Sequence, residues 1–252
     1  MASPKEINSI IKGANVLKCL FDGVGKIVDI SRNLDYNQAT VYRILKSLEK
    51  VGFATQDPLT RQYFPGPHIQ SLASNPLQVH QMLIRSARED MESLRDKINE
   101  SVSLEMARGS QRVTVQVVEA NQEIRYFCEN GHVMPIYSSA AGKILLTQFE
   151  PNKLKPLLKR IYNQPDAITR TIGSKESLFN ELKKIKRQGY SITIGEDHEG
   201  CAMIAVPIKN YPQPVSLGVA GPEERIKIKK TKILRHIKGH AANISDRLKN
   251  IF

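Results

Sequence analysis

The spacing of apolar residues changes near residue 100, and this change limits the folds open to the chain. Upstream, apolar residues recur at steps of three and four, which is the period of an α-helix. Downstream, six segments read as β-strands: "SVSLEMA", "RVTVQVVE", "IRYFCE", "YSITIG", "CAMIAVPI" and "VSLGVAG". Helices are expected between them, over about 141–161 with a restart at Glu150–Pro151 and over 175–188, and a long basic helix from about Glu223. These patterns predict an α+β protein with a mostly antiparallel sheet.

Residues 1–75 predict a winged helix-turn-helix domain. Helices are expected over 7–21 and 26–34, and a third begins at Asn37, which can cap it, and ends at Gly52. The segment "FATQDPLTRQYFPG" turns at Asp57-Pro58 and therefore reads as a β-hairpin. The apolar repeat of the first helix consists of Ile10, Ala14, Leu17 and Phe21.

The third helix combines an apolar stripe with a polar, outward face. Its stripe, which packs on the other two helices, consists of Val41, Ile44, Leu45 and Leu48. In a helix-turn-helix the second helix of the pair enters the major groove, where Arg can pair with guanine and Gln with adenine. An ordinary solvated face is the alternative, which the preceding short helix and the following hairpin disfavour. We therefore expect DNA contacts from Asn37, Gln38, Ala39, Thr40, Tyr42, Arg43 and Lys46, and from Arg61 and Tyr63 of the hairpin.

A linker helix is expected over 76–99, before a second domain that covers residues 100–252. Its apolar residues recur at helical spacing and form a seam made of Leu83, Ala87, Met91, Leu94 and Ile98. We predict that Leu83, Met91, Leu94 and Ile98 support self-association. Packing of the seam against the helix's own domain is the alternative.

The charge balance favours a polyanionic partner. The net charge is +12 with a pI near 9.6, which is typical of proteins that bind nucleic acid. The excess is modest in residues 1–75, with nine basic and six acidic residues, and strongest after residue 224, with nine basic residues and one acidic residue. The basic residues of the last helix either solvate an outer face or add a second phosphate contact: Lys227, Lys229, Lys230, Lys232, Arg235 and Lys238.

Other classes of protein are disfavoured. The sequence has no run of about 18 apolar residues that could span a membrane, and its first residues lack the apolar core of a signal peptide, so we expect a cytoplasmic protein. Cys19 lies among apolar residues and is expected in a core. The loop "GEDHEGC" could bind a metal or activate Cys201 as a nucleophile, but no second His/Cys cluster has ligand spacing. We expect no metal, cofactor or catalytic residue.

Several motifs together resemble the IclR family of transcriptional regulators. They are "NQATVYRILKSLEKVGF", "DPLTRQYFPGPHI", "ESVSL", "SSAAGKILL", "RTI", "LKKIKRQGYSI" followed by "EDHEGCAMIAVPI", and "VSLGVAGPEERI". The resemblance covers nearly the whole chain. It implies sequence-specific binding to double-stranded DNA, a GAF-like domain that senses a small-molecule effector, and a homodimer or a dimer of dimers. An effector-free architectural DNA-binding protein and an enzyme with an incidental helix-turn-helix are the alternatives.

The resemblance also implies an effector site on the sheet. In the family the ligand lies beside the loop that matches Ser139, Ala140, Ala141 and Gly142, and the late strands supply polar groups. Glu196 matches a family acidic position, but Thr193 stands where some members have an acid and Met203 where Cys is frequent. Gly218 and Ala220 stand where some members have serines. We therefore expect a less polar pocket that takes an apolar or aromatic ligand, or the loss of sensing.

Overall fold

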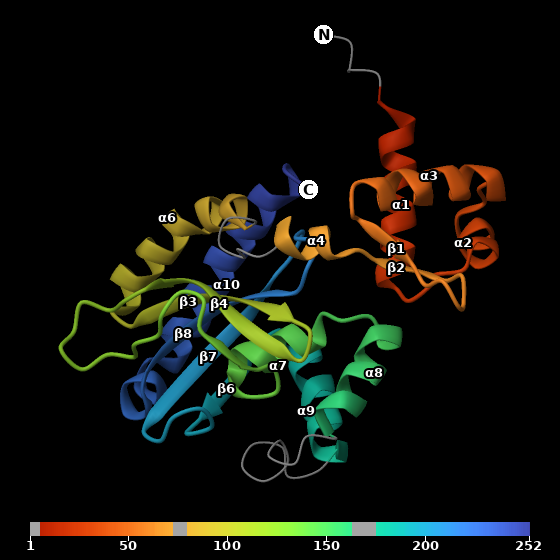
Figure 1. Cartoon of the computed structure of the whole chain (residues 1–252). Helices are drawn as coiled ribbons and strands as arrows, with labels where there is room; N and C mark the ends of the chain where they lie inside the picture. The colour runs from red at the N-terminus through yellow and green to blue at the C-terminus, as the bar shows by residue number, and fades with distance from the viewer. Residues whose placement is uncertain (1–5, 73–79, 163–174) are drawn as a thin grey trace. The chain divides into compact units, whose positions relative to one another are not determined.

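The computed structural model describes residues 6–72, 80–162 and 175–252 (Figure 1). The chain separates into two compact units, Met1–Asn75 and Pro76–Phe252. Among the described residues, no helix has the length and apolarity that a membrane crossing requires.

The first unit is the expected winged helix-turn-helix. Its helices are α1 (Asn8–Phe21), α2 (Ile27–Leu34) and α3 (Gln38–Lys50), and its hairpin pairs β1 (Ala54–Gln56) with β2 (Tyr63–Pro65). The cap of α3 is confirmed, because the side-chain oxygen of Asn37 accepts the Ala39 amide at 2.8 Å. Gly52 follows α3 at a φ of +71°, which glycine adopts without strain. A short helix that the sequence pattern did not predict follows the hairpin, α4 (Pro67–Leu72).

The buried face of α1 differs from the one that the apolar repeat indicates. Ile10 and Phe21 are exposed. The face toward α2 and α3 carries Val16, Cys19 and Leu20, so the placement of Cys19 in a core is confirmed. The repeat failed because α1 has apolar residues on two sides, and only one of them meets the other helices.

The second unit is built on one six-stranded sheet. Its strands are β3 (Ser101–Arg108), β4 (Gln111–Val118), β5 (Val133–Pro135), β6 (Ser191–Ile194), β7 (Cys201–Ile208) and β8 (Val215–Pro222). The order across the sheet is β5-β4-β3-β8-β7-β6, and each neighbouring pair is antiparallel. The helices are α6 (Gln81–Ile98), α7 (Ser139–Thr147), α8 (Pro151–Tyr162), α9 (Lys175–Gln188) and α10 (Glu223–Lys249).

One predicted strand is wrong. The segment 124–129 is not a strand, and β5 forms the sheet edge instead. Ile124 and Phe127 are exposed, and the Tyr126 carbonyl accepts a bond from the Ser101 hydroxyl at 2.6 Å. A β-favouring composition gives a strand only where a pairing strand and a packing surface are available. This segment pairs with no described strand, and Tyr126 is its apolar residue that packs against a core cluster.

Helices cover both faces of the sheet, as Figure 1 shows. Alternate residues of β7 and β8 pack in one core with α6 and α10, while Met203, Ala205 and Ala220 face α7. The self-association seam predicted for α6 lies inside this first core. The exposed fractions are 0% for Leu83, Met91 and Leu94 and 2% for Ile98, so the seam packs against its own unit.

The basic residues of α10 are partly engaged within the unit. The inward positions predicted for this helix are confirmed, since Ile237, Ala241, Ile244 and Leu248 are buried. Glu100 is fully buried and accepts two bonds from Arg225, at 2.9 and 2.7 Å, and one from Lys229 at 2.7 Å. Lys227 pairs with Glu223, and Lys238 lies over the Tyr190 ring. These contacts favour a structural role for three of the six cationic residues that the sequence singled out on this helix.

Candidate DNA interface and effector cavity

The outward face of α3 carries the residues that the sequence indicates. Gln38, Ala39, Tyr42 and Arg43 are exposed, while Val41 and Leu45 are fully buried on the opposite side. Thr40 is half-buried, and the Asn37 side chain caps the helix. The first turn of α3 therefore presents hydrogen-bonding side chains on a rigid support.

A concave surface joins α3 to the hairpin. Its volume is about 450 Å³, and its lining includes Tyr42 and Lys46 of α3 and Arg61 of the hairpin. Lys26, at the start of α2, also lines it and was not among the predicted residues. An exposed lysine before a short helix gives no signal by itself, because its proximity to the hairpin depends on the fold. Cations on a concave surface of this kind suit a phosphate backbone.

Lys46 is not free for such a contact without a rearrangement. Its ammonium donates to Glu49 at 2.7 Å, and this bond raises the pKa of Lys46. The pair is exposed, so a phosphate could replace Glu49 at little cost.

Tyr63 was predicted to contact DNA, and its burial corrects that prediction. Its exposed fraction is 1%, and its amide donates to the Gly25 carbonyl at 2.9 Å. The alternation of β2 turns Tyr63 inward and Phe64 outward. A Cβ at Gly25 would lie 2.3 Å from the Tyr63 carbonyl oxygen, so the glycine allows this close approach. Tyr63 therefore holds the hairpin to the helices and does not reach DNA.

The predicted effector loop forms the first turn of α7. The helix begins at Ser139, two residues before the expected start, and Ser139 has a φ of +64°. The Ala140 amide donates to the Thr193 hydroxyl at 3.0 Å, and the Gly142 amide to the Ser139 hydroxyl at 3.5 Å. A Cβ at Gly142 would lie 2.0 Å from the Ile136 carbonyl oxygen. The Ala140 amide thus joins α7 to β6, while the Gly142 amide bonds within the first turn of α7.

A small cavity lies on the sheet face that α7 covers. Its volume is about 20 Å³, and four predicted residues line it: Thr193, Glu196, Met203 and Ala220. The other lining residues are Tyr126, Asp197, His198, Cys201 and Ala202. Gly218 does not line it. A Cβ there would lie 2.2 Å from the Met203 methyl group, so Met203 occupies the space that a larger residue at 218 would need.

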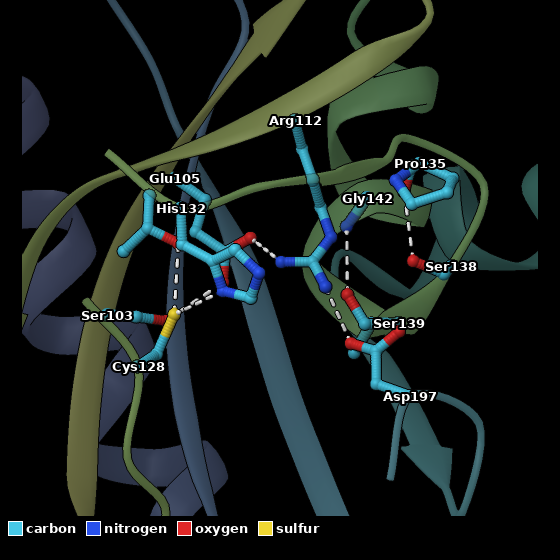
Figure 2. Close-up of polar contacts among 12 residues, drawn as sticks. Ser103, Glu105, Arg112, Cys128, His132, Pro135, Ser138, Ser139, Gly142 and Asp197 are labelled. Carbon is cyan, nitrogen blue, oxygen red and sulfur yellow. Dashed lines mark hydrogen bonds and ion pairs between the residues drawn. The ribbon is translucent and has the colours of Figure 1, made fainter. Parts of the chain in front are cut away.

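A buried charge network beside the cavity was not predicted. Arg112 of β4, with 3% of its side chain exposed, donates to Glu105 of β3 and, at 2.6 Å, to Asp197 (Figure 2). Burial disfavours the charged guanidinium, but the two carboxylates outweigh that effect and raise the pKa of Arg112. The sequence places Arg112 only at the start of a strand, and no local pattern reveals that three distant segments meet there.

Lys143 of α7 is the second buried cation. Only 1% of its side chain is exposed, and it donates to Glu181 at 2.9 Å and to Glu196 at 2.7 Å. Burial raises the pKa of Glu196 despite this contact. The lysine of the "GK" pair therefore connects α7, α9 and the loop before β7.

The two thiols of the second unit, Cys128 and Cys201, are partly buried. Cys128 Sγ lies 3.3 Å from His132 Nδ1, beside the Arg112 network (Figure 2). Burial raises the pKa of both Cys128 and Cys201, which favours the unreactive protonated thiol. Two of the three acids of "GEDHEGC", Glu196 and Asp197, pair with Lys143 and Arg112. Within the described ranges, no three His, Cys, Asp or Glu side chains are grouped so that they could hold a metal ion.

Comparison with known families decides the identity. The family described as "Bacterial transcriptional regulator IclR C-terminal" matches residues 77–246, and the IclR helix-turn-helix domain matches residues 9–58. The chain belongs to the IclR family. This IclR-family protein is accordingly a DNA-binding transcriptional regulator of the kind that responds to small-molecule effectors, and the resemblance drawn from its motifs is confirmed.

The relatives of this IclR-family regulator agree with that assignment. The regulator KdgR of Escherichia coli is 28% identical over 207 residues, which cover 81% of this chain and 78% of KdgR. The glycerol operon regulatory protein of Streptomyces coelicolor is 28% identical over 226 residues, covering 88% and 87%. The IclR structure of Thermotoga maritima has a TM-score of 0.63 at 24% identity, covering 97% of this chain and all of that one. An IclR-family structure from Brucella abortus has a TM-score of 0.60 at 20% identity, covering 96% of this chain and 93% of that one. The two structures show the fold, so the α+β prediction with a GAF-like second domain is confirmed.

Proposed function

We propose that this regulator reads operator DNA with the exposed face of α3, that the hairpin and Lys26 hold the flanking phosphates, and that a small molecule in the cavity modulates this binding without being chemically changed. The concave surface shared by α3 and the hairpin carries the proposal. It places Lys26, Lys46 and Arg61 around one hollow beside the outward face of the reading helix. In such complexes contacts to bases give sequence specificity, and contacts to phosphates position the protein. This surface offers side chains for both kinds of contact.

Arg43→Ala should weaken binding to operator DNA by about 1–3 kcal/mol and change binding to random DNA little, because a bidentate contact to guanine is lost. Genomic fragments captured by the protein would supply the operator. Lys50→Ala, an exposed charge removed from the other end of α3, is the matched control and should change both affinities little. An equal loss on both DNAs would assign Arg43 to a phosphate. A wild-type preference near one for operator over random DNA would favour the architectural alternative.

We also propose that the regulator is a homodimer whose first units associate through α1. An apolar groove of about 660 Å³ lies between α1 and α3, and Ile10, Leu17, Ile44, Leu48 and Phe53 help to line it. Thr40 and Arg43 of the DNA-reading helix line it as well, so the contact that we propose follows α1 and leaves them free. Ile10 is 66% exposed beside it. Exposed apolar residues along one helix can pack against the same residues of a second copy, as a two-fold interface requires. Helix-turn-helix dimers bind two half-sites, so a second copy of this chain is the occupant that we propose.

Ile10→Lys should shift the protein toward the monomer in sedimentation and weaken operator binding, while the thermal midpoint changes little because the residue is exposed. Ile228→Lys is the control, since Ile228 is 83% exposed on α10 and does not line the groove. An Ile10→Lys variant with the self-association of the wild type would place the interface elsewhere.

A further inference from the structure

The size of the effector cavity limits what it can enclose. A cavity needs about 10–15 Å³ to hold one water molecule, and this one offers about 20 Å³. It therefore encloses a single polar head group and no ring. Any larger portion of a ligand must extend past His198, which lines the cavity and is exposed.

Among the described residues that line this cavity, the buried polar atoms without a partner are hydrogen-bond acceptors. Glu196 uses one carboxylate oxygen for Lys143, and its Oε2 atom is buried without a partner among the described residues. Asp197 uses one oxygen for Arg112, and its Oδ1 atom is also buried without a partner among the described residues. Buried acceptors without donors are costly, so a ligand that brings N–H groups to both oxygens would be favoured.

The charges around the cavity also favour a ligand that carries a positive charge. Four carboxylates share the two buried cations, because Glu105 and Asp197 flank Arg112 while Glu181 and Glu196 flank Lys143. A bound cation would offset this imbalance, whereas a bound carboxylate would face two unpaired oxygens of like charge. Tyr126 adds a half-buried aromatic ring to the wall, and such rings attract ammonium groups.

We infer that the effector is a small organic amine, whose protonated amino group enters the cavity and donates to Glu196 Oε2 and Asp197 Oδ1. The inference rests on the proposed function of this cavity as the effector site. It replaces the sequence-based expectation of an apolar or aromatic head group. Apolar character is expected only in the part of the ligand that stays outside the cavity.

Two matched sets of compounds separate the head group from the rest of the ligand. Butylamine, butyrate and 1-butanol form one set, and benzylamine, benzoate and benzyl alcohol form the other. Each compound at millimolar concentration is added to the full chain, and the thermal midpoint and the calorimetric Kd are measured. Amines should stabilise the protein, and carboxylates and alcohols should not. Stabilisation by the carboxylates, or by none of the six compounds, would overturn the inference.

Variants identify the site of binding. Glu196→Gln and Asp197→Asn should each raise the Kd of the amines about tenfold, because the ammonium group loses an ion pair and keeps only a hydrogen bond to a neutral oxygen. Glu199→Gln, an exposed acid in the same loop, should leave the Kd unchanged. If Asp197→Asn fails to fold, Glu196→Gln remains as the test. That variant should fold, because Lys143 still has Glu181 as an ion-pair partner. Unchanged amine binding in Glu196→Gln would overturn the inference. Amine binding at this site without any effect on operator affinity would instead refute the regulatory role of the cavity.

Discussion

Met91→Lys combined with Leu94→Lys should unfold the second unit and not merely separate subunits. Both side chains are fully buried between α6, the sheet and α10. Removing a buried Met or Leu side chain costs about 2–5 kcal/mol, and burying an unpaired ammonium adds to this. The sum reaches the total stability of about 5–15 kcal/mol that domains have. Circular dichroism and urea titration of the full chain would measure the loss.

The control for this pair introduces two lysines on the same helix. Met82→Lys with Glu89→Lys places two lysines on exposed positions of α6 and should leave the urea midpoint nearly unchanged. A Met91/Leu94 variant that stays folded but sediments as a smaller species would contradict the packing described above. It would restore the idea that the α6 seam is a subunit interface.

Arg112→Leu should destabilise the second unit by about 3–5 kcal/mol, because breaking a buried ion pair leaves charge uncompensated. Glu105 and Asp197 would then lie together, buried, without their shared cation. Protonation would relieve that repulsion, so the stability difference from the wild type should shrink as the pH falls from neutral toward acid. Urea unfolding at several pH values would measure it.

Neutralising the two acids is the matching control. Adding Glu105→Gln and Asp197→Asn to Arg112→Leu should recover most of the lost stability and abolish the pH dependence of the difference. If Arg112→Leu alone is as stable as the wild type at neutral pH, the network contributes specificity or ligand binding and not stability. Failure of the triple variant to recover would mean that the shape of the Arg112 side chain matters more than its charge.

The parts of the structure that the sequence predicted well depend on local chemistry. The start and end of α3 follow from Asn37 and Gly52, which act on their immediate neighbours. The inward stripe of α10 follows from its own period, and the α7–α8 break at Glu150–Pro151 follows from proline. Such signals need no knowledge of the partner surface.

The parts that could not be predicted depend on distant segments. The apolar seam of α6 is compatible with its own sheet and with another subunit, and only the fold decides between them. Tyr63 has the composition of a DNA contact, and its burial follows from the strand alternation and from the gap at Gly25. Arg112 and Lys143 read as surface charges until β3, α9 and the loop before β7 bring carboxylates to them. The head group that we propose for the cavity depends on these pairs, so it could not be predicted from the sequence either.

The contact between Gly218 and the Met203 methyl group bears on how such a regulator could change its specificity. A methionine side chain is flexible, so a larger residue at 218 would displace that methyl group without breaking the sheet. The cavity that Met203 already lines offers the nearest room, and its 20 Å³ would be consumed. A larger residue at 218 would therefore reduce the volume of the cavity, although Gly218 does not line it. Adaptation to a smaller or larger head group can start behind the cavity wall, and the residues that hold the ligand can stay unchanged.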